Sequence, residues 1–183
     1  MKTYLLLALA AASLTATSCQ KDAPDAGLPP ATQVGANTGG CLINGERFVA
    51  TGYGSGLSRI PAFYGGFFED SLYYIEMSGI IREQKVMIAL FIRSDRPNVY
   101  SLNQNTQILY RAGLRNTLAY AAYQLSDTGE IYITSTSNTG KLDLTHASKN
   151  TGISAGTFEF TAASTFDPSK TITITNGRFD RKQ

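Results

Sequence analysis

Short runs in which apolar and polar residues alternate dominate the chain from residue 39 onward. In the run 73–82, the apolar residues Tyr73, Ile75 and Met77 are separated by single residues. A period of two places successive side chains on opposite faces of a β-strand, so we expect one face of this strand to be buried. Comparable runs predict strands at 42–43, 48–49, 120–125, 130–135, 141–145, 157–161 and 171–175, and less distinct ones at 99–102 and 108–112.

Two turns and one fully apolar strand stand out among these runs. Asn44-Gly45 separates two short apolar runs and predicts a β-hairpin with a type I′ turn, in which both central residues have positive φ. The run 86–92 is apolar at every position, which is typical of a central strand that is covered on both faces. The turn between this strand and the preceding one is expected at 82–85.

The pattern as a whole predicts an all-β fold. About nine to eleven short strands are expected, and no convincing amphipathic helix follows the first 18 residues. Because the connections are short, the strands are expected to be antiparallel. A barrel and a two-sheet sandwich both fit, and the need to cover 86–92 favours a closed or nearly closed barrel. After Asn176-Gly177 the apolar positions change parity, which indicates a bulge at Gly177.

The first 18 residues have the three parts of a secretory signal peptide. Lys2 gives a positive start, 4–12 is an apolar run, and small residues follow at 13–18. The apolar run is too short to span a bilayer, which takes about 20 residues. We therefore expect export across the inner membrane.

Cys19 directly follows the small residues, and this arrangement resembles a lipobox. A lipobox cysteine accepts a diacylglycerol and becomes the mature N-terminus. Ala16 stands where a large aliphatic residue is usual, and this looser form resembles the signals of Bacteroidota lipoproteins. The resemblance implies anchoring by acyl chains such as palmitate, in the outer membrane, on a side that the sequence leaves open. Ordinary secretion is the alternative, because Ala16 to Ser18 also fits a cleavage site.

Residues 19–38 are expected to form the lipidated N-terminus and a flexible linker. Prolines and glycines break regular structure there, and few large apolar side chains are present. A semi-extended segment of this length would reach about 50 Å. The folded unit is then a single β domain, 39–183.

Composition narrows the range of partners. The charge is +2, from 16 basic and 14 acidic residues, and no basic run is present, so nucleic acid is not an expected partner. Tyr and Phe are frequent and Trp is absent, which agrees with a β-rich core.

Three stretches resemble an uncharacterised family of small Bacteroidota lipoproteins. They are NTGGCLINGERF (37–48), SAGTFEFTA (154–162) and ITITNGRFD (172–180). The resemblance covers both ends of the domain. It implies a β domain in the cell envelope, and it implies no catalytic residues.

Few residues offer catalytic or metal chemistry. His146 is the only histidine, it shares the core-side parity of Leu144, and the sequence contains no G-x-S-x-G motif to accompany it. Cys41 lies next to apolar residues and is expected to be a buried thiol without a disulfide partner. We therefore expect no metal site, no cofactor and no catalytic residue.

The segment 53–68 combines aromatic residues with four glycines. Tyr53, Arg59, Phe63 and Tyr64 are candidate ligand-binding residues on a loop over a barrel mouth. The alternative is a long loop whose aromatic side chains close one end of the barrel.

We expect a non-enzymatic binding or structural module of the cell envelope. Its ligand would be a small molecule, a glycan or a protein. One alternative is a lipocalin-like carrier, which requires an open apolar interior. Another is a glycan hydrolase, which requires two carboxylates facing each other across a cleft. The candidates for such a pair are Glu69, Asp70, Glu76, Glu130 and Glu159.

Overall fold

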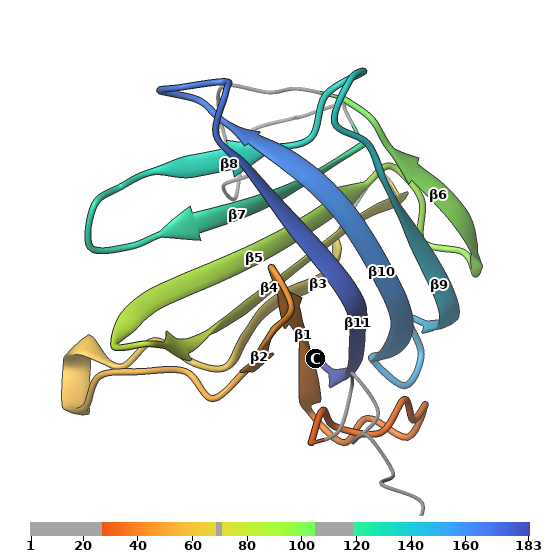
Figure 1. The fold of residues 1–183 in the computed structure, drawn as a ribbon. Coiled ribbons are helices and arrows are strands. Elements are labelled where there is room, and N and C mark those ends of the chain that lie inside the picture. Colours follow the sequence, from red (N-terminus) through yellow and green to blue (C-terminus); the bar gives the residue numbers. More distant parts are fainter. Residues whose placement is uncertain (1–26, 69–70, 105–118) are drawn as a thin grey trace, which may run out of the picture.

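A computed structural model describes residues 27–68, 71–104 and 119–183 (Figure 1). The expected signal peptide, Cys19, the expected strand 108–112, Glu69 and Asp70 lie outside these ranges. Within them, no helix has the length and apolar character needed to cross a membrane.

The structure confirms the all-β prediction for the part of the chain that it describes. Eleven strands and one turn of 3₁₀ helix, η1 (Gly56–Ser58), follow one another along the chain. The strands are β1 (Thr38–Ile43), β2 (Glu46–Val49), β3 (Phe63–Phe68), β4 (Leu72–Ile81), β5 (Gln84–Ile92), β6 (Asn98–Leu102), β7 (Tyr120–Leu125), β8 (Ile131–Ile133), β9 (Gly140–Ser148), β10 (Ile153–Ser164) and β11 (Thr171–Lys182).

All strands belong to one antiparallel sheet that curls strongly into a half-barrel (Figure 1). The main order is β2-β1-β11-β10-β8-β7-β5-β4-β3. One edge of β10 pairs with β11, and its other edge pairs first with β9 and then, at its end, with β8. β6 pairs with the outer edge of β9. Where the sheet curls round, the backbone N–H groups of Thr51 and Gly52 donate to the carbonyl of Ser78 on β4.

Large side chains fill the interior of the half-barrel. Tyr73, Met77 and Leu90 are fully buried there, and Phe158 and Phe179 pack against each other from β10 and β11. A second, smaller cluster lies on the other face of β4, β5 and β7, around Phe91 and Tyr120. Both faces of β5 are therefore buried, as its apolar sequence predicts.

The two predicted hairpin turns are present. Asn44 and Gly45 have φ values of 49° and 84°, which confirms a turn with two positive φ values. The turn between β4 and β5 also has two such residues, Arg82 and Glu83, with φ values of 46° and 65°. Neither of these is glycine, so this turn carries a conformational cost.

β11 continues through Asn176-Gly177 to Lys182, with a bulge at this point. Phe158 pairs with Gly177 and Phe160 with Ile174, so β11 has an additional residue there. The predicted bulge is confirmed, and the parity change in the sequence follows from it.

One strand was not predicted. The second half of the expected loop 53–68 is β3, which pairs with β4 along its whole length. Gly65 and Gly66 hide it in the sequence because they interrupt the apolar pattern and resemble a turn. Both have positive φ, and a side chain on Gly65 would collide with the carbonyl oxygen of Tyr74. The glycines thus allow an irregular edge strand at this position.

The core-side position expected for His146 is wrong. Leu144 pairs with Gly156, whereas His146 pairs with Ala155, so Thr145 is an extra residue in β9. A one-residue insertion reverses the alternation of the residues that follow it. His146 therefore lies on the outer face, where it is half-buried.

A linker was expected up to residue 38, but its second half is bound to the sheet. The segment Gly27–Asn37, which we call the strap, contains no strand and lies at the end of the half-barrel that carries the C-terminus (Figure 1). Thr32, Val34 and Gly35 donate hydrogen bonds from the strap to the carboxylate of Asp180 on β11.

Candidate functional site

The structure does not gather the four candidates of segment 53–68 into one site. Phe63 is buried in the core, and its neighbour Tyr64 points to the other face of the sheet, where it is half exposed. Tyr64 makes an edge contact with Tyr74, with ring centroids 6.4 Å apart. A ligand could therefore contact Tyr64 without reaching Phe63.

Tyr53 and Arg59 lie in the loop that contains η1. Tyr53 forms an isolated bridge with Ile60, and its hydroxyl is 3.0 Å from the hydroxyl of Ser126 in the turn between β7 and β8. Arg59 is exposed. These contacts hold the loop against a neighbouring turn.

Three of the carboxylates proposed for glycan hydrolysis, Glu76, Glu130 and Glu159, belong to the described part of the chain, and they lie on different elements. Glu76 lies on the outer face of β4, where burial raises its pKa although hydroxyl groups of Tyr74 and Ser78 donate to it. Glu130 lies between β7 and β8, and Glu159 lies on β10. Each of the three carboxylates has its own polar partners, which are Tyr74 and Ser78 for Glu76, Ser164 for Glu130 and Lys141 for Glu159.

Cys41 is a free thiol with no exposed surface, as the sequence predicts. Burial raises the pKa of this thiol, so it is protonated and shielded at neutral pH. In the described ranges no group of three or more His, Cys, Asp or Glu residues is placed to hold a metal ion.

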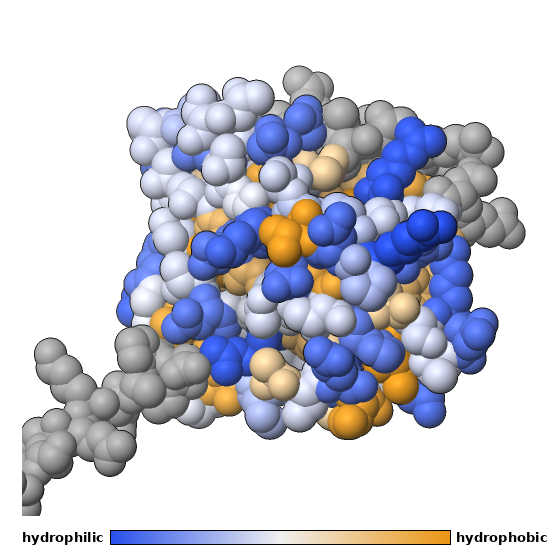
Figure 2. Space-filling view, turned by 90° about the vertical axis from the view of Figure 1, so that its right-hand side faces the viewer, coloured by the Kyte–Doolittle hydropathy of each residue, from blue (hydrophilic) through white to orange (hydrophobic). Residues whose placement is uncertain are grey.

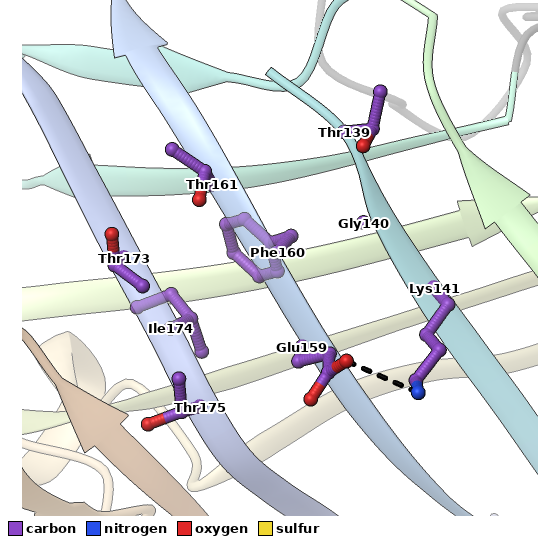
Figure 3. Close-up of a pocket in the computed structure, with 9 residues that line it drawn as sticks. All are labelled: Thr139, Gly140, Lys141, Glu159, Phe160, Thr161, Thr173, Ile174 and Thr175. Carbon is purple, nitrogen blue, oxygen red and sulfur yellow. Dashed lines mark ion pairs between the residues drawn. The ribbon is translucent and has the colours of Figure 1, made fainter.

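Hollows in the surface follow the outer face of β10. We call three of them, taken together, the β10 groove. Its middle part has a volume of about 460 Å³ and lies across β9, β10 and β11 (Figure 3). Phe160 and Ile174 contribute mainly backbone to it, because their side chains are buried in the core. The side chains that line it on the outer face are those of Thr139, Lys141, Glu159, Thr161, Thr173 and Thr175.

An ion pair crosses the middle of the groove. Lys141 and Glu159 are cross-strand neighbours, and Lys141 Nζ lies 3.1 Å from Glu159 Oε1 (Figure 3). Both side chains are more than half exposed, at 58% and 54%. Exposed ion pairs contribute at most about 1 kcal/mol, so these two groups can turn to a ligand at little cost.

The groove continues from this ion pair toward the strap. A hollow of about 360 Å³ shares Lys141 and Glu159 with the middle part and extends to Thr157, Arg178 and Ala31. Ala31 belongs to the strap, so the strap forms the wall at this end.

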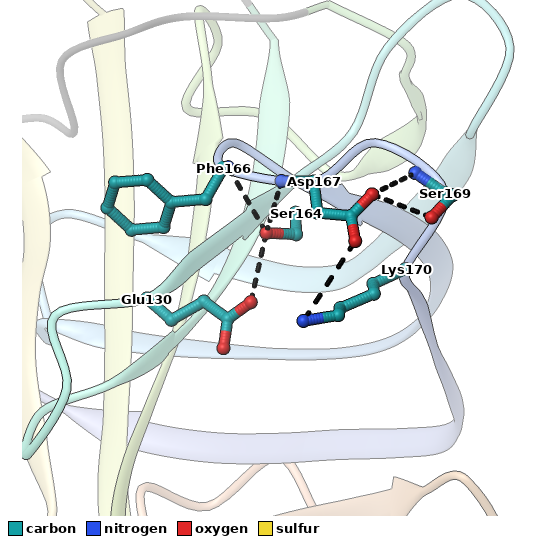
Figure 4. A network of polar contacts seen from close by, with 6 residues as sticks. All are labelled: Glu130, Ser164, Phe166, Asp167, Ser169 and Lys170. Carbon is teal, nitrogen blue, oxygen red and sulfur yellow. Dashed lines mark hydrogen bonds and ion pairs between the residues drawn. The ribbon is translucent and has the colours of Figure 1, made fainter.

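The third hollow lies further along β10 beside the loop between β10 and β11, and it shares no lining residue with the middle part. It has a volume of about 470 Å³ and is lined by Ile133, Ala163, Pro168 and several hydroxyl and amide side chains. Its floor includes Ser164, whose hydroxyl donates to Glu130 and accepts from the backbone N–H groups of Phe166 and Asp167 (Figure 4). Ser164 is 2% exposed and fully engaged, so it shapes the loop and is poorly placed to act as a nucleophile.

The three parts follow the outward residues of one strand. From Thr157 to Thr165 a strand extends for about 26 Å, at 3.3 Å per residue. The bulge in β11 lies opposite Glu159 and brings Asn176, with a φ of 53°, to the rim. Bulges commonly redirect side chains beside binding sites.

Hydroxyl groups and a loosely paired cation and anion give this groove its chemistry. A hydroxyl both donates and accepts hydrogen bonds, so a row of threonines suits a partner that carries many hydroxyl or amide groups. Figure 2 shows the neighbouring side of the molecule as mainly hydrophilic, with apolar side chains in separate spots. The side chains that line the middle of the β10 groove therefore suit an elongated polar ligand.

Sequence reasoning missed this groove, although part of the signal was present. Thr157, Glu159 and Thr161 are the polar halves of the alternation in β10, and Thr173 and Thr175 are those of β11. Polar outward residues are ordinary on a solvated sheet. Only the pairing of these strands with β9 shows that they line one continuous surface.

Comparisons with known proteins place the chain in a family. No curated protein and no solved structure matches it significantly. Residues 74–181 match the family described as Domain of unknown function (DUF6252), and this span includes two of the three motifs noted in the sequence, those at 154–162 and 172–180. Since the match covers more than half of the chain, the protein belongs to the DUF6252 family.

Proposed function

We propose that this protein is a non-enzymatic binding module of the bacterial cell envelope that holds an extended glycan in the β10 groove. The observation that carries the proposal is the groove itself, a row of hollows along one strand with hydroxyl groups on both sides and an ion pair in the middle. An extended polymer of hydroxyl-bearing units matches its length and its chemistry.

The filled interior supports a surface site. A lipocalin-like carrier needs an open apolar cavity, whereas the space inside the half-barrel is occupied by side chains such as Tyr73, Met77 and Phe158, which are at most 3% exposed. In the described part of the chain, the hollows that we assign to the ligand lie on the outer face of the sheet.

The envelope location rests on the N-terminal sequence. Cys19 follows an apolar run and small residues, so the proposal includes a diacylated Cys19 and an outer-membrane anchor. Mass spectrometry of the protein produced in a Bacteroidota host should identify a lipidated N-terminal peptide that begins at Cys19. An unmodified Cys19 in a fully soluble protein would contradict this part of the proposal.

The groove is tested by binding to arrayed glycans. A soluble form without the signal peptide is applied to capsular, lipopolysaccharide and peptidoglycan fragments. Thr161→Arg places a long charged side chain in the middle of the groove, and we expect it to weaken binding at least tenfold. Gln84→Arg adds the same group at an exposed position of β5 that does not line the groove, and this control should bind as the unmodified protein does.

Two results would count against the glycan assignment. The first is an absence of binding to every arrayed glycan. The second is equal weakening by both substitutions, since that would indicate a general charge effect rather than occupation of the groove.

A further inference from the structure

The strap is fixed to the sheet mainly by one carboxylate. Thr32 Oγ1 donates to Asp180 at 2.5 Å, and the backbone N–H groups of Val34 and Gly35 donate at 3.0 Å and 2.7 Å. Ala36 N–H donates to the same carboxylate. Asp180 has no exposed surface, so these donors replace the water that it would otherwise bind.

Further contacts hold the strap on both sides of Asp180. The side-chain oxygen of Asn37 accepts from the backbone N–H of Lys182 and from Arg181 Nη1, at 3.0 Å and 2.9 Å. At the other end, Arg47 Nη1 donates to the carbonyl of Gly27 at 3.4 Å. The strap is thus attached from Gly27 to Asn37.

Gly35 shows how closely the strap approaches the sheet. It has a φ of 77°, and a Cβ at this position would lie 2.9 Å from Cβ of Lys182 and 3.2 Å from a carbon of Ile153. Only glycine meets both requirements, that is, the left-handed backbone and the close approach. The strap therefore has a specific seat and is not a segment that merely lies over the surface.

From these contacts we infer that the end of the half-barrel that carries the strap and the C-terminus is the end that faces the membrane. This rests on the proposed lipid at Cys19. With Gly27–Asn37 fixed, only the residues between Cys19 and Gly27 can act as a tether, and the eight steps from Cys19 to Gly27 span at most about 29 Å. An unattached segment up to Thr38 would span at most about 68 Å.

The short tether also orients the β10 groove. Ala31 of the strap forms one end wall of the groove, and the loop with Phe166 lies at the other end of β10. The groove therefore begins near the lipid surface and runs away from it. A glycan bound along it would be directed outward from the membrane.

Energy transfer to labelled lipids tests this orientation. The full lipidated protein is placed in vesicles that contain an acceptor on the lipid headgroups. A donor is attached to a cysteine introduced either at Asn150, in the turn between β9 and β10 beside the C-terminus, or at Phe166, at the far end of β10. Cys41 is buried and should remain unlabelled. We expect clearly stronger transfer from position 150 than from position 166.

Two substitutions then release the strap, one on the sheet and one in the strap itself. Asp180→Asn removes the charge that collects the four donors, and Gly35→Ala makes the seat sterically unfavourable. In both variants the difference in transfer between the two positions should fall at least twofold. Amide hydrogen exchange at Val34, whose N–H also donates to Asp180, reports strap release in both variants of the soluble protein, independently of any lipid.

The outcomes separate the inference from the proposed function. Absence of lipid on Cys19 by mass spectrometry overturns the envelope proposal. Lipidated protein with equal transfer from the two positions overturns the orientation. An unchanged difference in variants whose Val34 amide exchanges freely shows that the strap does not orient the domain, and it overturns the inference as well.

Discussion

The contact between Gly177 and Phe158 gives the sharpest prediction about stability. A Cβ added to Gly177 would lie 2.5–2.6 Å from three carbons of the Phe158 ring, about 1 Å closer than a favourable carbon contact. The ring cannot retreat easily, because Phe158 is 3% exposed and packs on Phe160 and Phe179 with ring centroids 6.4 Å and 6.5 Å away. Overpacking of this kind costs about 1–3 kcal/mol, and we expect Gly177→Ala to lie at the upper end.

Chemical denaturation of the soluble protein measures this cost. Phe158→Leu makes room for the methyl group, so the double variant should lose at least about 1 kcal/mol less than the sum of the two single variants. Gly45→Ala is the matched control, since a Cβ there meets nothing within 4 Å and only its φ of 84° is unfavourable. Strictly additive losses, or a Gly177→Ala loss no larger than that of the control, would refute the steric explanation.

Three further predictions follow from individual residues. Burial raises the pKa of the Cys41 thiol and shields it, so a thiol reagent should label it slowly in the native protein and fully after unfolding, and rapid native labelling would contradict its burial. Gly45→Val should lower the free energy of unfolding by about 1 kcal/mol or more, because a β-branched residue resists positive φ, and an unchanged denaturation midpoint would refute the role of the turn. Burial opposes ionisation of Asp180, but the hydrogen bonds from the strap outweigh it and hold the pKa of Asp180 below its usual value. Strap binding should therefore be constant above about pH 4, the pKa of an unfolded aspartate, and should weaken as the pH falls through the lower pKa of folded Asp180. The chemical shift of the Gly35 amide in an NMR titration follows this change. Weakening that begins between pH 7 and pH 5 would contradict the prediction.

Local patterns predicted most of the strands because each strand has one face in the core. The alternation in 73–82 and the apolar run 86–92 correspond to β4 and β5, and Asn44-Gly45 forms the expected turn. The prediction failed where glycine hides the pattern, as in β3, and where an inserted residue reverses it, as at Thr145.

The candidate site could be predicted far less well, because its parts are distant in the sequence. Asp180 receives hydrogen bonds from residues nearly 150 positions earlier, and no local pattern marks that contact. The β10 groove combines outward residues from three strands with Ala31 of the strap. In the sequence, each residue of the groove resembles an ordinary solvent-exposed position. The site can therefore be recognised only once the strand pairing is known.

Mapping of ligand contacts by NMR is the most direct test of the central claim that the outer face of β10 holds a glycan. The amide resonances of the soluble protein are followed while a glycan that binds on the array is added. The account predicts the largest shifts at Thr157, Glu159 and Thr161, with smaller ones at Thr173 on β11. Shifts concentrated on the buried residues of the half-barrel interior, or around Tyr53 and Tyr64, would contradict it.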